Sequence, residues 1–235
     1  MPTKTMPITV LRLGAPSAET CARLGGYEDW IAQNLTTATR SIDIIGGEAP
    51  PTHADCRGVI LTGSVHMVGE RLPWSEALRP WLQEAVAREL PVFAICYGHQ
   101  LLADALGGTV GANPNGAEIG NITLNRLPAC DDDPLFAPLP ATFSANAWHS
   151  ESVLQLPPGA VPLVANAHDP HHAYRLGKNA WGVQFHPEIT REIATVWAAN
   201  NEDVDTEDIV AGYDAHEGDL ASTCKTLADW VSGVF

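Results

Sequence analysis

Residues 91–108 read PVFAICYGHQLLADALGG, and this stretch predicts a buried strand that runs straight into a helix. The apolar run 91–95 is continuous rather than alternating, as in a parallel strand covered on both faces. Cys96 ends the run, and a helix predicted over 98–106 follows at once, closed by Gly107 and Gly108. Such a sharp strand-to-helix turn is a nucleophile elbow, because it pushes the side chain at the turn out of the sheet.

The position of Cys96 in this turn favours a reactive thiol. Gly98 lets the helix and the strand approach closely, and the dipole at a helix N-terminus favours the thiolate. The alternative is that Cys96 is a buried apolar residue at the end of a strand, because free cysteine is often buried. This segment alone leaves both interpretations open.

The rest of the chain extends the same pattern. Apolar runs bounded by turn residues predict further strands over 7–13, 41–45 and 58–61, and amphipathic spacing predicts helices over 28–39 and 75–89. Strands that alternate with helices imply βαβ units. We therefore expect the α/β class, with a doubly wound, mostly parallel, flavodoxin-like sheet that carries helices on both faces.

The pattern changes from about residue 117. Short strands are predicted over 119–127, 141–145, 161–165, 172–176 and 181–185, the last two joined by a hairpin turn at 176–179. Residues 191–235 are mostly helical and acidic, with a polar break at 200–207. We expect one domain over 1–235: a core of about 7–195 with an added short antiparallel strand region, and an acidic helical extension of about 196–235 packed on it.

Composition limits the function classes. The 235 residues carry a formal net charge of −15, so the average surface repels nucleic acid and anionic membranes. The five cysteines are scattered without a CxxC pair, which favours a reducing compartment. No apolar run is long enough to span a bilayer, and the run at 8–11 is too short for a signal peptide. We expect a cytoplasmic protein without a nucleic-acid or membrane partner.

Two further segments carry candidate chemistry. Residues 181–188 read WGVQFHPE and end a strand with His186 and then Glu188. A thiol needs a base to become a good nucleophile, and the base needs an acceptor that orients it; a surface His-Pro-Glu turn would have the same sequence. Residues 62–65 follow a strand with small side chains, where backbone N–H groups can point at an oxyanion, although many strand-to-helix turns look alike.

Taken together, five blocks resemble class I (triad-type) glutamine amidotransferases, in particular their stand-alone, GMP synthase-like branch. The blocks are CYGHQ at 96–100, ALGG at 105–108, GAEIG at 116–120, HSESV at 149–153 and GVQFHPE at 182–188. The resemblance covers roughly residues 40–190, and the order and spacing of the blocks are far more specific than any one of them.

The resemblance implies a catalytic triad of Cys96, His186 and Glu188. In the family, the cysteine attacks the side-chain carbonyl of glutamine, the histidine moves the thiol proton to the leaving ammonia, and the glutamate orients the histidine. Water then hydrolyses the γ-glutamyl thioester, and no metal or organic cofactor is needed.

The resemblance also implies which residues hold the substrate. The oxyanion would be held by the backbone N–H groups of Ser64 and Tyr97, and the substrate would be bound by Gly63, Gln100, Trp148 and His149. Two positions depart from the family pattern: Ala94 stands where many members have glycine, and residues 62–65 read TGSV rather than beginning Gly-Gly-Pro. We expect the first to matter little and the second to change the shape of the pocket.

Other polar residues are candidates for separate roles. His168, Asp169, His171 and His172 suggest a metal site, but their place before a hairpin favours an exposed loop, and we expect no metal. Glu118 is a candidate to brace the pocket, and His99 is a candidate for packing rather than for a base.

Three functions follow from the resemblance. The first is hydrolysis of glutamine with transfer of ammonia to an unidentified acceptor, such as a separate synthetase. The second is a hydrolase of γ-glutamyl peptides or conjugates that acts alone; it shares the thioester, and partner-stimulated glutaminase activity would distinguish the first. The third is a non-catalytic binding protein on this scaffold, which the intact triad disfavours.

Overall fold

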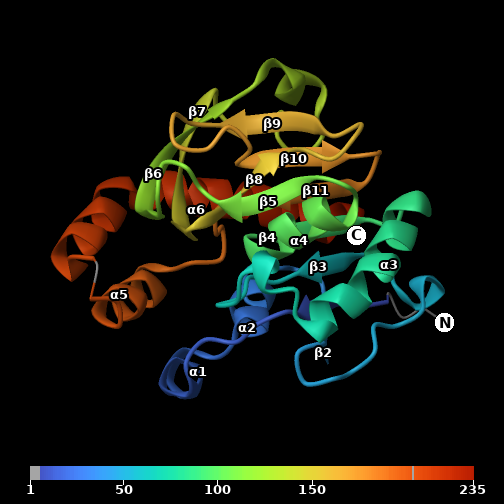
Figure 1. The fold of residues 1–235 in the computed structure, drawn as a ribbon. Helices are drawn as coiled ribbons and strands as arrows, with labels where there is room; N and C mark the ends of the chain where they lie inside the picture. The colour runs from blue at the N-terminus through green and yellow to red at the C-terminus, as the bar shows by residue number, and fades with distance from the viewer. Residues whose placement is uncertain (1–5, 203) are drawn as a thin grey trace.

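The computed structural model describes residues 6–202 and 204–235, and a nine-stranded sheet forms its centre (Figure 1). Five neighbouring strands run parallel, in the order β2 (Thr39–Asp43), β1 (Ile8–Arg12), β3 (Val59–Leu61), β4 (Val92–Ile95) and β11 (Ala180–Val183). This part of the sheet confirms the predicted α/β class and its doubly wound, parallel core.

The other four strands are antiparallel and extend the same sheet. They follow β11 in the order β10 (Ala173–Leu176), β9 (Val161–Ala165), β6 (Glu118–Arg126) and β7 (Thr142–His149). Leu176 pairs with Ala180, which confirms the hairpin predicted at 176–179. A separate two-stranded sheet, β5 (Thr109–Ala112) with β8 (Glu151–Gln155), has no counterpart among the predicted strands.

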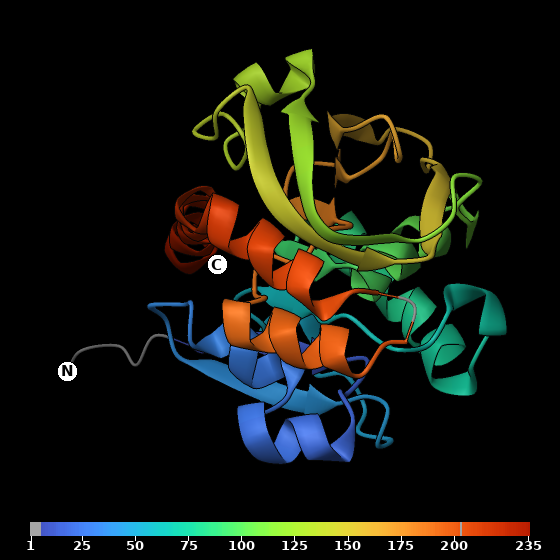
Figure 2. The ribbon, with the colours of Figure 1, turned by 90° about the vertical axis from the view of Figure 1, so that its left-hand side faces the viewer.

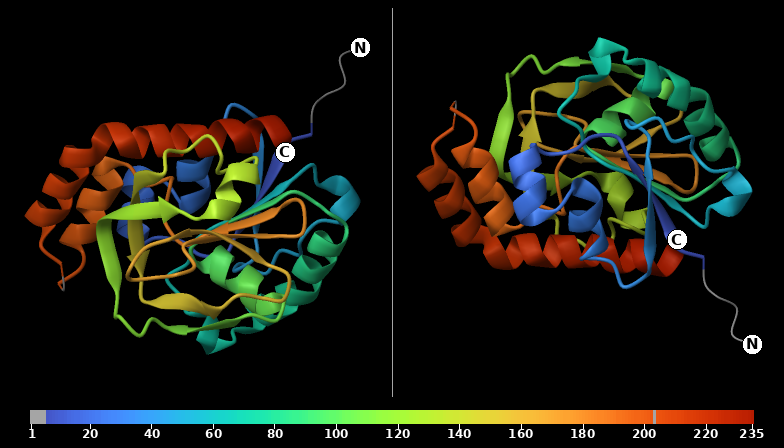
Figure 3. Two further views of the ribbon diagram at one scale, coloured as in Figure 1. Left: turned by 90° about the horizontal axis from the view of Figure 1, so that it is seen from above. Right: turned by 90° about the horizontal axis from the view of Figure 1, so that it is seen from below.

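Helices cover both faces of the parallel strands (Figure 3). The α-helices of the described residues are α1 (Ala18–Leu24), α2 (Tyr27–Ala32), α3 (Pro73–Ala87), α4 (Tyr97–Ala105), α5 (Arg191–Ala199) and α6 (Thr206–Val234). Side chains of β4 alternate between two apolar layers: Phe93 and Ile95 lie in the cluster that includes α6, and Val92 and Ala94 lie in the cluster that includes α3 and α4. Burial on both faces explains why the β4 sequence is apolar throughout.

The helix predicted over 28–39 is wrong in its second half. The helix α2 ends at Ala32, and β2 begins at Thr39. In between, the Thr36 N–H donates to Ser232 Oγ at 3.1 Å, and the Thr37 hydroxyl donates to the Ser232 carbonyl at 3.1 Å. Contacts with α6, far away in the chain, therefore override the local helical spacing.

The polar break predicted near the C-terminus is confirmed, because α5 ends at Ala199 and α6 begins at Thr206. Figure 2 shows α6 running beneath β6 and β7. Its last turns add Leu227, Val231 and the following Phe235 to the core. Among the described helices, none combines the length and the apolar character that crossing a membrane requires.

The elbow at the end of β4 has the geometry that its sequence predicts. Cys96 adopts φ 49° and ψ −103°, a conformation that costs energy for any residue but glycine. Two residues later, a Cβ atom on Gly98 would lie 2.6 Å from Leu61 Cβ and 3.0 Å from the Leu61 carbonyl oxygen. Glycine at position 98 therefore permits a close approach of α4 to a strand, but this strand is the neighbouring β3 rather than β4, the strand that precedes the turn.

Replacing Gly98 by alanine is expected to destabilise the protein by about 1–3 kcal/mol, because the added methyl group overpacks a closed contact. Gly218→Ala is the matched control: Gly218 is also helical, and nothing lies within 4 Å of the position that its added methyl group would take. That change should stabilise by about 0.5–1 kcal/mol. Urea unfolding measures the change in the free energy of unfolding for each variant. A change of the same sign in both variants would refute the close contact at Gly98.

Candidate active site

Three strand ends bring the predicted site residues together. In the sheet, β4 lies between β3 and β11, and all three strands run parallel. Gly63 follows β3, Cys96 follows β4 and His186 follows β11. Because the carboxyl ends of parallel strands meet at one edge of the sheet, residues far apart in the chain become neighbours there.

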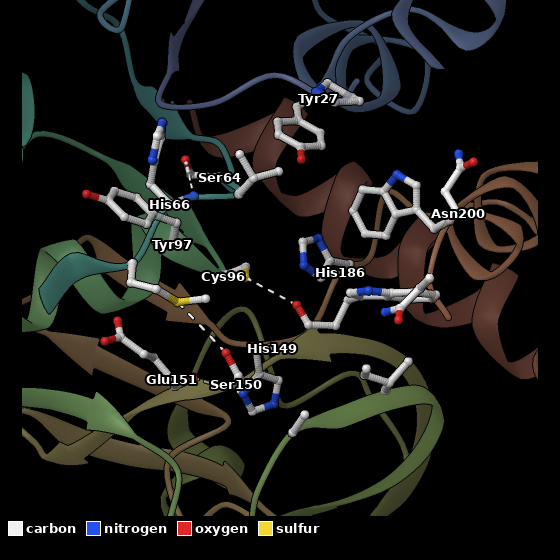
Figure 4. A pocket seen from close by; sticks show the side chains of 18 of the residues that line it. Tyr27, Ser64, His66, Cys96, Tyr97, His149, Ser150, Glu151, His186 and Asn200 are labelled. Atoms are coloured by element: carbon white, nitrogen blue, oxygen red, sulfur yellow. Dashed lines mark hydrogen bonds between the residues drawn. The ribbon is translucent and has the colours of Figure 1, made fainter. Parts of the chain in front are cut away.

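His186 and Glu188 form a buried, hydrogen-bonded pair beside Cys96. The His186 Nδ1–H donates to Glu188 Oε1 over 2.7 Å, and each of the two side chains is 3% exposed. Cys96 lies next to the imidazole in the cavity (Figure 4). A Cβ atom on Gly63 would lie 3.2 Å from His186 Cε1, which is a tight contact, and 3.8 Å from Cys96 Cβ, which is an ordinary one, so a larger residue would crowd the imidazole.

The charge of His186 follows from these contacts. Burial alone lowers the pKa of an imidazole, but the negative charges of Glu188 and Cys96 outweigh burial and raise the pKa of His186 from 6.5 to about 10. His186 is therefore protonated at neutral pH. Because Glu188 holds the proton on Nδ1, the proton on Nε2 is the one available to Cys96 or to a bound molecule.

Comparison with known proteins shows the family to which the chain belongs. The family model described as "Glutamine amidotransferase class-I" matches residues 24–200. The chain belongs to the class-I glutamine amidotransferase family. The crystal structure of a glutamine amido transferase from Methylobacillus flagellatus shares the fold of this family member, with a TM-score of 0.80 at 23% identity over 98% of this chain and 96% of that one.

This chain covers a small part of one similar protein and most of another. The GMP synthase (glutamine-hydrolyzing) of Thermomicrobium roseum is 39% identical over 137 residues, which are 58% of this chain and 24% of that protein. Gamma-glutamyl peptidase 4 of Arabidopsis thaliana is 28% identical over 192 residues, which are 78% of this chain and 76% of that protein. The chain thus spans about a quarter of the first relative and about three quarters of the second.

A cavity of about 540 Å³ opens over Cys96 in this amidotransferase-family chain. Its walls include the predicted residues Ser64, Tyr97, Gln100, Trp148 and His149. The Gln100 side-chain amide is fixed, because its Nε2 donates to the Glu151 carbonyl at 2.7 Å and to Gln184 Oε1 at 3.0 Å. Tyr97 is the first residue of α4, so its backbone N–H has no partner within that helix.

Glu118 holds His149 from the buried side of the cavity wall, as a brace would. Its Oε2 accepts a hydrogen bond from His149 Nε2 at 3.0 Å and lies 2.9 Å from His172 Nε2, and its Oε1 accepts one from Asn166 at 2.7 Å. Burial alone raises the pKa of a carboxyl group, but these donors outweigh burial and lower the pKa of Glu118. An ionised Glu118 thus fixes the ring of His149.

The four residues predicted as candidates for a metal site are not brought together. His168 Nε2 lies 3.0 Å from the Gly116 carbonyl, and His171 Nδ1 lies 2.6 Å from the Val153 carbonyl. The expectation of an exposed loop is wrong for Asp169 and His172, because both are fully buried. Among the described residues, the group that could hold a metal is instead Glu118, His149 and His172, whose spacing near 3 Å is that of hydrogen bonds.

His99, which follows the elbow, packs in the interior. Its ring is fully buried and lies 4.7 Å from the ring of Tyr174. Burial lowers the pKa of His99 to about 3, so the imidazole is neutral at physiological pH. The structure confirms packing at position 99.

Proposed function

We propose that this chain hydrolyses the side-chain amide of a γ-glutamyl compound through a thioester on Cys96. The observation that supports it most is the pairing of Cys96, at its strained elbow, with a protonated His186 that Glu188 orients. A sulfur beside a protonated imidazole can attack a carbonyl, and the imidazolium can protonate the departing amine. A scaffold used only for binding would not need this arrangement.

The proposed reaction has two steps. The Cys96 sulfur forms a C–S bond to the amide carbon, and the C–N bond breaks as His186 Nε2 gives its proton to the departing ammonia or amine. The neutral His186 then takes a proton from a water molecule, whose oxygen attacks the thioester carbon. Cleavage of the C–S bond releases glutamate and restores the Cys96–His186 pair.

The backbone and side chains around Cys96 have assigned roles in this proposal. The oxyanion is held by the backbone N–H groups of Ser64 and Tyr97, the second of which lies at the positive end of α4. Gly63 leaves room for the reacting carbonyl. The glutamyl part is bound by the Gln100 side chain and by the backbone near Trp148 and His149, where Cys96 Sγ lies 3.9 Å from the Trp148 carbonyl.

Two candidate functions differ in what becomes of the released ammonia or amine. The similarity to a GMP synthase that hydrolyses glutamine supports glutamine as substrate and a separate synthetase as the acceptor of ammonia. The similarity to gamma-glutamyl peptidase 4 along most of its length supports the second candidate, a γ-glutamyl conjugate hydrolase that acts alone.

Both candidates form a thioester on Cys96, and this step is tested by incubating the purified chain with glutamine and with a panel of γ-glutamyl compounds. Intact-mass analysis should then show a γ-glutamyl adduct on Cys96; an adduct elsewhere, or none with any hydrolysed substrate, would contradict it.

Replacing Glu188 by glutamine is expected to lower kcat by about 10²–10⁴-fold and to change the pH profile. The imidazolium must keep its proton until the amine leaves, so activity should fall as pH rises through the His186 pKa of about 10. Glutamine removes the negative charge that raises this pKa, while the burial that lowers it stays. The alkaline limb of kcat/KM should therefore move to lower pH.

Glu217→Gln is the matched control for this profile, because Glu217 is an exposed residue of α6 outside the cavity. Its alkaline limb should coincide with that of the unmodified protein. An alkaline limb that stays in place in Glu188→Gln would show that Glu188 does not set the charge of His186.

A further inference from the structure

We propose that the cavity binds the amine half of its substrate on an aromatic wall formed by Tyr27, Trp148 and Trp197. The preferred substrates are then γ-glutamyl amides of large apolar or aromatic amines. The orientation of the substrate rests on the function proposed above. The wall itself rests on the geometry of the cavity.

The position of His186 fixes the side on which the amine leaves. A group that receives a proton from His186 Nε2 must lie within hydrogen-bonding reach of that nitrogen. The amine therefore points from Cys96 towards His186 and whatever lies beyond its ring. Figure 4 shows Tyr27 and Asn200 on that side, whereas Tyr97 and Glu151 lie on the opposite side of Cys96.

Three aromatic rings from separate elements meet around His186. The ring centroid of Trp197, on α5, lies 5.7 Å from that of His186 at an interplanar angle of 88°. Trp197 is also 5.2 Å from Trp148 of β7 and 6.1 Å from Tyr27 of α2, both in edge-to-face geometry. All three side chains line the cavity: Trp148 and Trp197 are half-buried and offer apolar surface to a ligand, and Tyr27, which is 3% exposed, supports Trp197 from behind.

The size of the cavity exceeds what ammonia needs as a leaving group. A water molecule, which is close to ammonia in size, takes up about 30 Å³ of the liquid. Cavities of about 300–1,000 Å³ bind drug-sized ligands, and this one has about 540 Å³. The whole cavity, which also has to hold the glutamyl half, is therefore in the size range of sites for ligands that carry a substantial group on the amide nitrogen.

The charges around the cavity restrict that group. Among the described residues that line it there is no lysine or arginine, and its acidic members are Glu151 and Glu202. Glu151 lies on the other side of Cys96, so a leaving amine that carries carboxylates or phosphates would meet Glu202, with no lysine or arginine in the described lining to balance the charge. The amine half should therefore be neutral or cationic as well as apolar.

A purely structural role for Trp197 makes a different prediction. Trp197 also packs 5.6 Å from Trp30, within the apolar cluster beneath the cavity. If packing were its whole role, its loss would weaken all ligands alike. If Trp197 contacts the amine half, its loss should weaken only ligands with a large amine.

The test measures binding, in the Cys96→Ala background, of γ-glutamyl-benzylamide and γ-glutamyl-methylamide by calorimetry. Both are alkylamides, so they differ mainly in the ring. The benzylamide should bind more tightly by about tenfold or more. Adding Trp197→Ala should reduce this ratio to about threefold or less, and Trp197→Phe should keep part of it. The ratio compares the affinities of one protein sample for the two amides, so partial unfolding of a variant does not change it.

Trp81→Ala is the matched control, because Trp81 stacks on His53 outside the cavity, and it should keep the full ratio. A benzylamide that binds no better than the methylamide, or a ratio that survives Trp197→Ala, would overturn the aromatic wall. The hydrolytic proposal fails separately: protein with Cys96 intact would then bind both amides with the expected preference and cleave neither.

Discussion

Replacing Cys96 by alanine is expected to lower the release of ammonia or amine from every γ-glutamyl substrate by on the order of 10⁴–10⁶-fold. Alanine cannot form the C–S bond on which the proposed route depends. The thiols of Cys130 and Cys224 are poor substitutes, because burial raises the pKa of Cys130 and raises that of Cys224 to about 11. Loss of a single sulfur atom leaves the surrounding core in place, so the fold should survive.

Cys56→Ala provides the control for this loss of a thiol. Cys56 is also buried, at 8% exposed, but it lies before β3 and does not line the cavity. Its variant should keep both activity and the γ-glutamyl adduct on Cys96, and circular dichroism melting should show both variants folded. Release of ammonia or amine at the unmodified rate from Cys96→Ala would end the proposal of a Cys96 thioester.

Part of the site was predictable from the sequence. Local patterns place Cys96 and His186 each at the end of an apolar strand, but they do not show that the strand before His186 runs parallel to β4, so only the family resemblance brought the two residues together. The sharp turn at Cys96 predicts a small residue near position 98. The contact that requires glycine there is with Leu61 of β3, which the local sequence does not show.

Other features depend on contacts that no local pattern contains. Glu118 is recognisable as a polar residue in a strand, but its two imidazole partners come from β7 and from the residue before β10. Trp197 has the sequence signature of a packing residue in a helix. Only the placement of α5 over the strand ends brings its ring beside His186. Long-range packing decides such positions, and a single sequence does not state it.

Replacing His186 by asparagine is expected to lower kcat/KM for γ-glutamyl amides by on the order of 10⁴-fold, because both the activation of the thiol and the protonation of the amine are lost. A change of leaving group distinguishes the activation of the thiol from the protonation of the amine. A γ-glutamyl ester of a phenol expels a stable anion that needs no proton, so general acid catalysis, typically worth about 10²–10⁴-fold, no longer matters for it. The loss should therefore be at least about tenfold smaller for the ester than for the amide.

The comparison requires two reference variants. His216→Asn changes a histidine of α6 that lies outside the cavity and bonds within its own helix, and it should hydrolyse both substrates at the unmodified rates. Cys96→Ala should lose activity on the amide and on the ester to the same extent, because every acyl transfer in the proposed route passes through the sulfur. If His186→Asn instead lowers kcat/KM for the ester and for the amide by the same factor, then His186 acts only on the thiol. The proton for the departing amine would then come from another group or from water.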